Sequence, residues 1–176
     1  MEAGVAVVKS HFPFSQAYQL AERLNQSAKE YALDLMKEED LNAPPIAMDW
    51  HIANSGTIGS LASIRETYKR GRINLLTRPV TVGHTSGWRR WEVLEDLMSV
   101  FTSTDWDQNR SKLREMEDVF LEGSEGLQKY LRFQALPDLP ITPEIQAYGG
   151  ENGFVGDTAV HYDALDAIDF YKISTL

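Results

Sequence analysis

The first fifty residues hold a short apolar run, a long periodic stripe and a second apolar run. Residues 4–8 are rich in valine, which is typical of a buried strand. From about 16 to 37, apolar residues recur every three or four positions, which predicts a helix with one core-facing stripe. Pro44 and Pro45 cannot continue that helix. The run at 46–53 (IAMDWHIA) then predicts a second strand.

Shorter elements follow this strand. Asn54-Ser55-Gly56 is a turn signal, and a short helix is expected near 58–69. The run at 73–82 (INLLTRPVTV) predicts a third strand. Pro79 cannot donate to a strand ladder, so it marks a sheet edge or a bulge. Residues 1–84 are therefore expected to form an α/β piece.

After Gly83 the apolar spacing becomes helical, which predicts an all-helical piece over 85–176. Glycines at 123–126 are expected to interrupt it, and the three prolines of 136–144 (LPDLPITPE) indicate a linker. The GGENG run at 149–153 is expected to be a plain loop. The helices are expected over 87–102, 107–122, a short segment ending at 133, and 157–173.

Composition narrows the class of protein. The 176 residues, 43% of them apolar, suffice for one domain, or at most one and a half, with a real core. The absence of cysteine excludes disulfides and thiolate metal sites. The N-terminus has no signal-peptide pattern, and no apolar run is long enough for a membrane span. A cytoplasmic location is expected.

Charge argues against a free nucleic-acid binder, because the net charge is −9 and such proteins are usually basic. Any nucleic-acid contact must be local or shared with a basic partner. Basic residues cluster at Arg70 and Arg72, and at Arg89 and Arg90. These arginines are candidates for a local phosphate contact or for an interface. Trp88 and Trp91, beside them, are candidates for core packing or for a docking surface.

Several motifs carry a family resemblance. The strand at 4–8, followed by a helix with an Ala28-Lys29 pair, resembles the second half of a nucleotide-cyclase palm. Such palms occur in GGDEF diguanylate cyclases and in the large subunit of type III CRISPR effector complexes. The cyclases normally end soon after this helix. The later motifs are similar to those of the CRISPR subunit: Asp49-Trp50-His51, Ser55-Gly56, LLTRPVTV with Thr77 to Thr81, RSKL at 110–113 and DAIDFY at 166–171.

This resemblance implies an α+β fold. Half of a ferredoxin-like palm, with a short helix and an edge strand, would occupy 1–84, and a C-terminal helical bundle would follow. The intact family is a nucleotidyltransferase that makes cyclic oligoadenylate from ATP with Mg²⁺, inside an RNA-guided complex for antiviral defence. The Gly-Gly-Asp-Asp or Gly-Gly-Asp-Glu hairpin that should precede residue 4 is missing. The chain is therefore expected to supply one wall of a nucleotide pocket and to be inactive alone.

The nucleotide contacts are expected on the first helix and strand. The resemblance implies that Lys29 reaches the nucleotide phosphates. Ser27, on the opposite flank of the helix, and Lys9, just after the first strand, are further candidates. No catalytic residue and no metal ligand is expected, because the acidic runs, at 38–40 and on the last helix at Asp163, Asp166 and Asp169, suit solvated faces.

The expected partners are other effector subunits or the missing half of the palm, with guide RNA bound only indirectly. Unpaired strand edges also predict self-association. One alternative is a stand-alone binding or structural module, derived from a palm and without a nucleotide role. Another is a degenerate relative of diguanylate cyclases that senses a guanine nucleotide.

Overall fold

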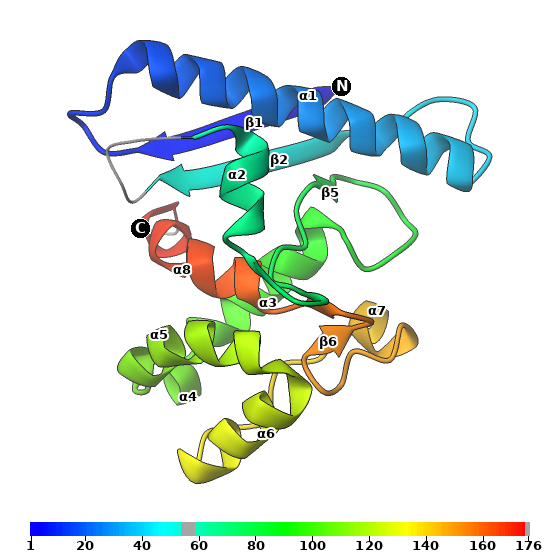
Figure 1. The fold of residues 1–176 in the computed structure, drawn as a ribbon. Helices are drawn as coiled ribbons and strands as arrows, with labels where there is room; N and C mark the ends of the chain where they lie inside the picture. Colours follow the sequence, from blue (N-terminus) through cyan, green and yellow to red (C-terminus); the bar gives the residue numbers. More distant parts are fainter. Residues whose placement is uncertain (54–58, 175–176) are drawn as a thin grey trace. The chain divides into compact units, whose positions relative to one another are not determined.

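A computed structural model describes residues 1–53 and 59–174, with side chains described as far as Tyr171. The expected Asn54-Ser55-Gly56 turn lies outside these residues. The fold is mixed α/β, with small sheets and helices (Figure 1). It divides into two compact units: unit 1 comprises 1–67 and 78–91, and unit 2 comprises 68–77 and 92–176. A domain boundary near residue 84 stays a prediction.

Unit 1 is built on a parallel pair of strands, β1 (Glu2–Val8) and β2 (Ala47–Ala53). Their register runs from Glu2 opposite Ala47 to Val8 opposite Ala53. The short β5 (Val80–Thr81) pairs antiparallel with the other side of β2, so the sheet order is β1-β2-β5. The two strands expected from the apolar runs at 4–8 and 46–53 are therefore present, and β1 lies at an edge.

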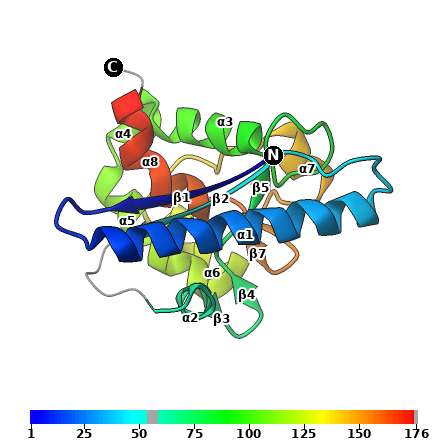
Figure 2. The ribbon, with the colours of Figure 1, turned by 90° about the horizontal axis from the view of Figure 1, so that it is seen from above.

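Helix α1 (Phe14–Glu38) connects the parallel strands and lies along one face of them (Figures 1 and 2). Its buried positions are Leu20, Leu24, Ala28 and Ala32, at spacings of four; the first three belong to the expected stripe. Gly4 of β1 faces this helix, because a Cβ built there would lie 2.2 Å from both the Ala21 carbonyl oxygen and the Asn25 nitrogen. The backbones of α1 and β1 thus pack directly against each other.

The prediction of a single strand over 73–82 is wrong. Residues 73–74 form β4 (Ile73–Asn74) in the sheet of unit 2, and β5 joins the sheet of unit 1. The Asn74 side chain donates to the Leu76 carbonyl and accepts from the Leu76 N–H, which turns the chain after β4. Pro79, which has no N–H, immediately precedes the edge strand β5. The short helix α2 (Leu61–Glu66) begins after its N-cap, Ser60.

Unit 2 is not all-helical, contrary to the prediction. It contains a four-stranded sheet in the order β3-β4-β7-β6, from β3 (Lys69–Arg70), β4, β6 (Phe154–Val155) and β7 (Thr158–Ala159). Two-residue strands are too short to produce an alternating pattern. The parallel partner of β7 is β4, which lies more than eighty residues earlier in the chain.

The helices of unit 2 are shorter than expected. The expected interruption lies at Gly123, whose φ of 79° ends the 3₁₀ turn after α5, whereas Ser124 to Gly126 already belong to α6. The proline-rich segment at 136–142 packs within unit 2: Leu139 is buried, and the Pro140 carbonyl is 2.7 Å from His161 Nε2. The helices are α3 (Trp91–Phe101), α4 (Thr104–Asp107), α5 (Arg110–Val119), a 3₁₀ turn (Phe120–Glu122), α6 (Gly123–Phe133), α7 (Pro143–Ala147) and α8 (Tyr162–Ser174).

Across 1–53 and 59–174, no helix combines the length and the apolar character that crossing a membrane requires.

Candidate functional site

The outer edge of β1 offers unused backbone groups. The Met1 carbonyl accepts a hydrogen bond from the Ala47 N–H of β2. Successive residues of a strand turn their backbone groups to alternate sides. Gly4, Ala6 and Val8 therefore direct their N–H and C=O groups away from β2, and no strand among the described residues pairs with that side. This side of β1 is called the open edge below.

One flank of α1 overhangs the open edge. Asn25 Nδ2 donates to the Glu2 carbonyl oxygen at 2.9 Å, so the Asn25 side chain reaches over the outer side of β1. Lys29 lies one helical turn farther along, on the same flank, and is exposed. A lysine on this flank can reach a ligand held beside the start of β1. Lys29 is therefore an exposed lysine one helical turn beyond the residue that contacts the start of β1.

The other two candidate phosphate contacts do not converge with Lys29. Lys9 follows the carboxyl end of β1, whereas Asn25 and Lys29 lie at its amino end. The seven residues of β1 span about 23 Å. Ser27 is half-buried and lies on the flank of α1 that faces away from the open edge. One phosphate group cannot contact all three side chains.

Two of the motifs that carry the family resemblance, Asp49-Trp50-His51 and LLTRPVTV, are in contact in unit 1. The Arg78 guanidinium lies 5.1 Å from the centre of the Trp50 ring, and both residues are buried. Trp91 packs edge-on against Trp50, with 6.2 Å between ring centres. Trp91 is therefore engaged in packing within unit 1. An arginine stacked on an indole ring stabilises this packing.

The neighbouring Asp49 and His51 form a buried charged cluster with arginines. Asp49 is fully buried, accepts from its neighbour Trp50 N–H at 2.8 Å, and pairs with the Arg65 guanidinium. Burial, together with the positive charges of Arg78 and Arg65, lowers the pKa of His51 to about 4. His51 is therefore neutral at pH 7. Sequence reasoning did not assign Arg65 to this cluster, because the spacing within a six-residue helix indicates no buried partner.

The basic candidates divide between the two units. In unit 1, the Arg89 guanidinium lies 4.7 Å from the Tyr31 ring centre, and Arg90 donates to the His84 carbonyl at 3.1 Å. In unit 2, Arg72 pairs with Asp157 at 3.1 Å, and Arg70 is exposed. Trp88, of unit 1, is half-buried. A phosphate-binding or docking role for these residues stays a prediction.

Glu39, His84 and Ser86 form a polar cluster at the end of α1. Ser86 Oγ lies 2.8 Å from His84 Nε2 and 2.7 Å from a Glu39 carboxylate oxygen. Hydrogen bonds from Ser86 and His84 hold the pKa of Glu39 below its ordinary value. A catalytic triad needs the acid on the histidine nitrogen that the serine does not use. Here the acid and the serine meet the same nitrogen, so the geometry does not support a nucleophilic serine.

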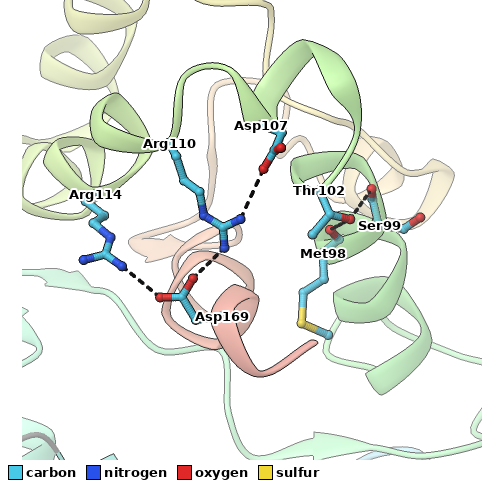
Figure 3. Close-up of polar contacts among 7 residues, drawn as sticks. All are labelled: Met98, Ser99, Thr102, Asp107, Arg110, Arg114 and Asp169. Carbon is cyan, nitrogen blue, oxygen red and sulfur yellow. Dashed lines mark hydrogen bonds and ion pairs between the residues drawn. The ribbon is translucent and has the colours of Figure 1, made fainter. Parts of the chain in front are cut away.

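Two further motifs meet in unit 2 (Figure 3). Arg110, the first residue of RSKL, contacts Asp107 at 3.2 Å and Asp169 at 2.5 Å, and Asp169 belongs to DAIDFY. Arg114 reaches the other carboxylate oxygen of Asp169 at 3.0 Å. Helices α5 and α8 are thus joined by a carboxylate between two guanidinium groups. All four side chains are partly exposed, so these pairs contribute little to stability.

The expectation that Asp163 belongs to a solvated face is wrong. Asp163 is fully buried and accepts hydrogen bonds from the Thr77 N–H at 2.8 Å and the Thr77 hydroxyl at 2.7 Å. It ties α8 to the end of the 68–77 segment. Its role in unit 2 is structural, since the carboxylate satisfies a buried backbone donor.

The pKa of Glu117, on α5, is raised, and this predicts that the stability of the protein depends on pH. This pKa is raised to about 7, chiefly by burial and also by the negative charges of Asp166, Asp118 and Asp169, while Arg114 opposes the rise. Because the folded state holds this proton more tightly than the unfolded state, the free energy of unfolding falls as pH rises from about 5 to 7. Above about pH 7, the ionised Glu117 lowers the free energy of unfolding by its full amount. Glu117→Gln should raise the free energy of unfolding by about 1–2 kcal/mol at pH 8, after allowance for partial exposure.

The same variant should give no gain at pH 5, where Glu117 is protonated. Urea denaturation at both pH values measures the difference, with the exposed Glu95→Gln as the control for loss of one negative charge. An equal gain at pH 5 and pH 8 would contradict a raised pKa at Glu117.

The described residues contain no group of three or more histidine, aspartate or glutamate side chains that could hold a metal ion. No protein-family model matches the chain, and a search of curated proteins finds no match.

Proposed function

We propose that this chain is a C-terminal or split part of the large subunit of a type III CRISPR effector complex, or of a close relative. In this proposal unit 1 contributes one wall of an ATP-binding palm, and the helices of unit 2 dock other effector subunits. The motif resemblance supports it, and so does the strand-helix-strand order of β1, α1 and β2. Two pairs of the resembling motifs are also in contact, through Trp50 with Arg78 and Arg110 with Asp169.

The observation that carries the proposal is the exposure of Lys29 on the flank of α1 whose Asn25 contacts the Glu2 carbonyl of β1. In the resembling palms, the acidic hairpin immediately precedes this strand. A partner strand that supplied the hairpin could pair with the outward groups of Gly4, Ala6 and Val8. It would then lie beneath the α1 flank that carries Asn25 and Lys29. A second copy of the chain is the competing occupant of this edge.

Lys29 fits a phosphate contact, because it is exposed and lies on the flank that reaches over β1. Lys9, at the other end of β1, does not fit the same site. In the complete palm, ATP with Mg²⁺ supplies the reacting phosphates, and the carboxylates that hold Mg²⁺ come from the partner. The contribution of this chain is a positive charge that orients the phosphates.

A stand-alone, non-catalytic binding or structural module derived from a palm is the second candidate. The observation that favours it is the direct pairing of β1 with β2 over seven residues. The ferredoxin-like palm is a split βαβ fold, in which another strand separates the two parallel strands. In this alternative, the sheet β1-β2-β5 is complete, and no further strand inserts between β1 and β2.

Titration calorimetry with ATP and Mg²⁺ separates the two candidates. We expect weak ATP binding, reduced about five- to tenfold by Lys29→Ala, because a charge-assisted contact to phosphate is lost. Lys9→Ala is the matched control, since it removes an exposed lysine at the opposite end of β1, and it should bind ATP like the unmodified chain. No binding, or equal losses in both variants, would favour the stand-alone module. A preference for GTP would indicate the cyclase-derived sensor.

A further inference from the structure

Unit 1 has a hollow on the flank of α1 that faces away from the open edge. Its volume is about 420 Å³, which lies in the range of small-molecule sites. It lies between the first half of α1 and the residues that lead into α2. The described residues that line it are Gln16, Gln19, Leu20, Arg23, Gly59 and Ser60.

The lining suits an anion. It offers the Arg23 guanidinium and the amides of Gln16 and Gln19, and none of its described side chains is acidic. The Ser60 hydroxyl is engaged in capping α2 through Ser63. Arg23 forms no ion pair with any described residue. The planar fork of an arginine binds phosphate oxygens through two parallel hydrogen bonds. In a chain with a net charge of −9, this hollow is a local exception.

The position of the hollow also suits a ligand. The parallel strands β1 and β2 end at Val8 and Ala53, and the helices that follow them begin at Phe14 and Leu61. In parallel α/β sheets, ligands bind in the crevice outside the carboxyl ends of the strands. Gln16 lies in the first turn of α1, at the positive end of the dipole of this 25-residue helix, which favours negative charge.

We propose that this hollow binds the phosphate group of a small molecule, with Arg23 as the main contact and Gln16 and Gln19 as further hydrogen-bonding groups. The site is separate from that of Lys29, because the two side chains lie on opposite flanks of α1. Its existence does not depend on the CRISPR proposal.

An NMR titration with inorganic pyrophosphate tests this site. We expect shifts of the backbone amides of Gln16, Gln19 and Ser60, and none of them with adenosine, which lacks phosphate. Arg23→Gln should weaken pyrophosphate binding about tenfold, and Gln19→Ala about threefold, because each removes donors to the anion. Lys37→Gln, which removes an exposed lysine from the far end of α1, is the matched control and should leave the affinity unchanged.

Arg23 and Gln19 are exposed, so both variants should keep the melting temperature of the unmodified chain. Absence of shifts at these three amides with millimolar pyrophosphate would overturn the proposal. So would an equal loss of affinity in Arg23→Gln and Lys37→Gln. Loss of pyrophosphate binding in Lys29→Gln alone would overturn this site and support the nucleotide contact of the proposed function, so the two proposals fail separately.

Discussion

Gly4→Ala should destabilise the protein by about 3 kcal/mol, the upper part of the range for inserting an atom into a packed site. The added Cβ would lie 2.2 Å from the Ala21 carbonyl oxygen and from the Asn25 nitrogen, both of which belong to the α1 backbone. A change of rotamer cannot relieve a clash between a Cβ and a helix backbone, so α1 must move away from β1. The Asn25 contact to the Glu2 carbonyl should weaken with it.

Urea denaturation measures this loss, and Ala3→Ser is the matched control. Ala3 is the neighbouring residue on the exposed face of β1, and serine adds one heavy atom there. The control should change the free energy of unfolding by less than about 0.5 kcal/mol. A Gly4→Ala protein as stable as the control would show that α1 does not pack directly on β1.

Asp49→Ala should cost about 3–5 kcal/mol, the range for breaking a buried ion pair by removing one partner. The fully buried carboxylate pairs with Arg65 and accepts the N–H of Trp50. Without it, the guanidinium of Arg65, whose side chain is only 18% exposed, keeps its charge in a poorly solvated position.

The exposed pair of Asp34 and Lys37, 3.1 Å apart, provides the control. Asp34→Ala removes the same side chain from an ion pair in water, and should cost less than about 0.5 kcal/mol. Adding Arg65→Met to Asp49→Ala should recover part of the lost stability, because it removes the uncompensated charge. Equal effects of Asp49→Ala and Asp34→Ala in thermal or urea unfolding would contradict the burial of Asp49.

The long elements of unit 1 could be predicted because their patterns are long. The 25 residues of α1 repeat the apolar spacing over seven turns, and the strands β1 and β2 are apolar runs bounded by turn residues. The strands β4 to β7 have two residues each, so no periodicity exists to detect. Their pairing depends on partners far away in the sequence, such as Asn74 with Thr158.

Of the candidate site, only the positions of side chains on a single helix could be predicted from the sequence. The flank of Lys29 follows from its spacing to Asn25, but the contact of Asn25 with Glu2 depends on tertiary structure. Asp163, Asp166 and Asp169 recur every three residues, and this spacing predicts that they share a solvated face of the last helix. Six residues along a helix correspond to a rotation of about 240°, so the carboxylates of Asp163 and Asp169 lie on different faces. Asp163 is accordingly buried, whereas Asp169 is exposed.

The central claim is that the chain works with a partner that supplies the acidic hairpin. Affinity purification from the source organism, analysed by intact mass spectrometry and RNA analysis, tests it most directly. We predict co-elution with a polypeptide that carries a Gly-Gly-Asp-Asp or Gly-Gly-Asp-Glu hairpin, together with a guide RNA. Recovery of the chain alone, or only with further copies of itself, would contradict the claim, and the function would then have to be sought in a stand-alone module.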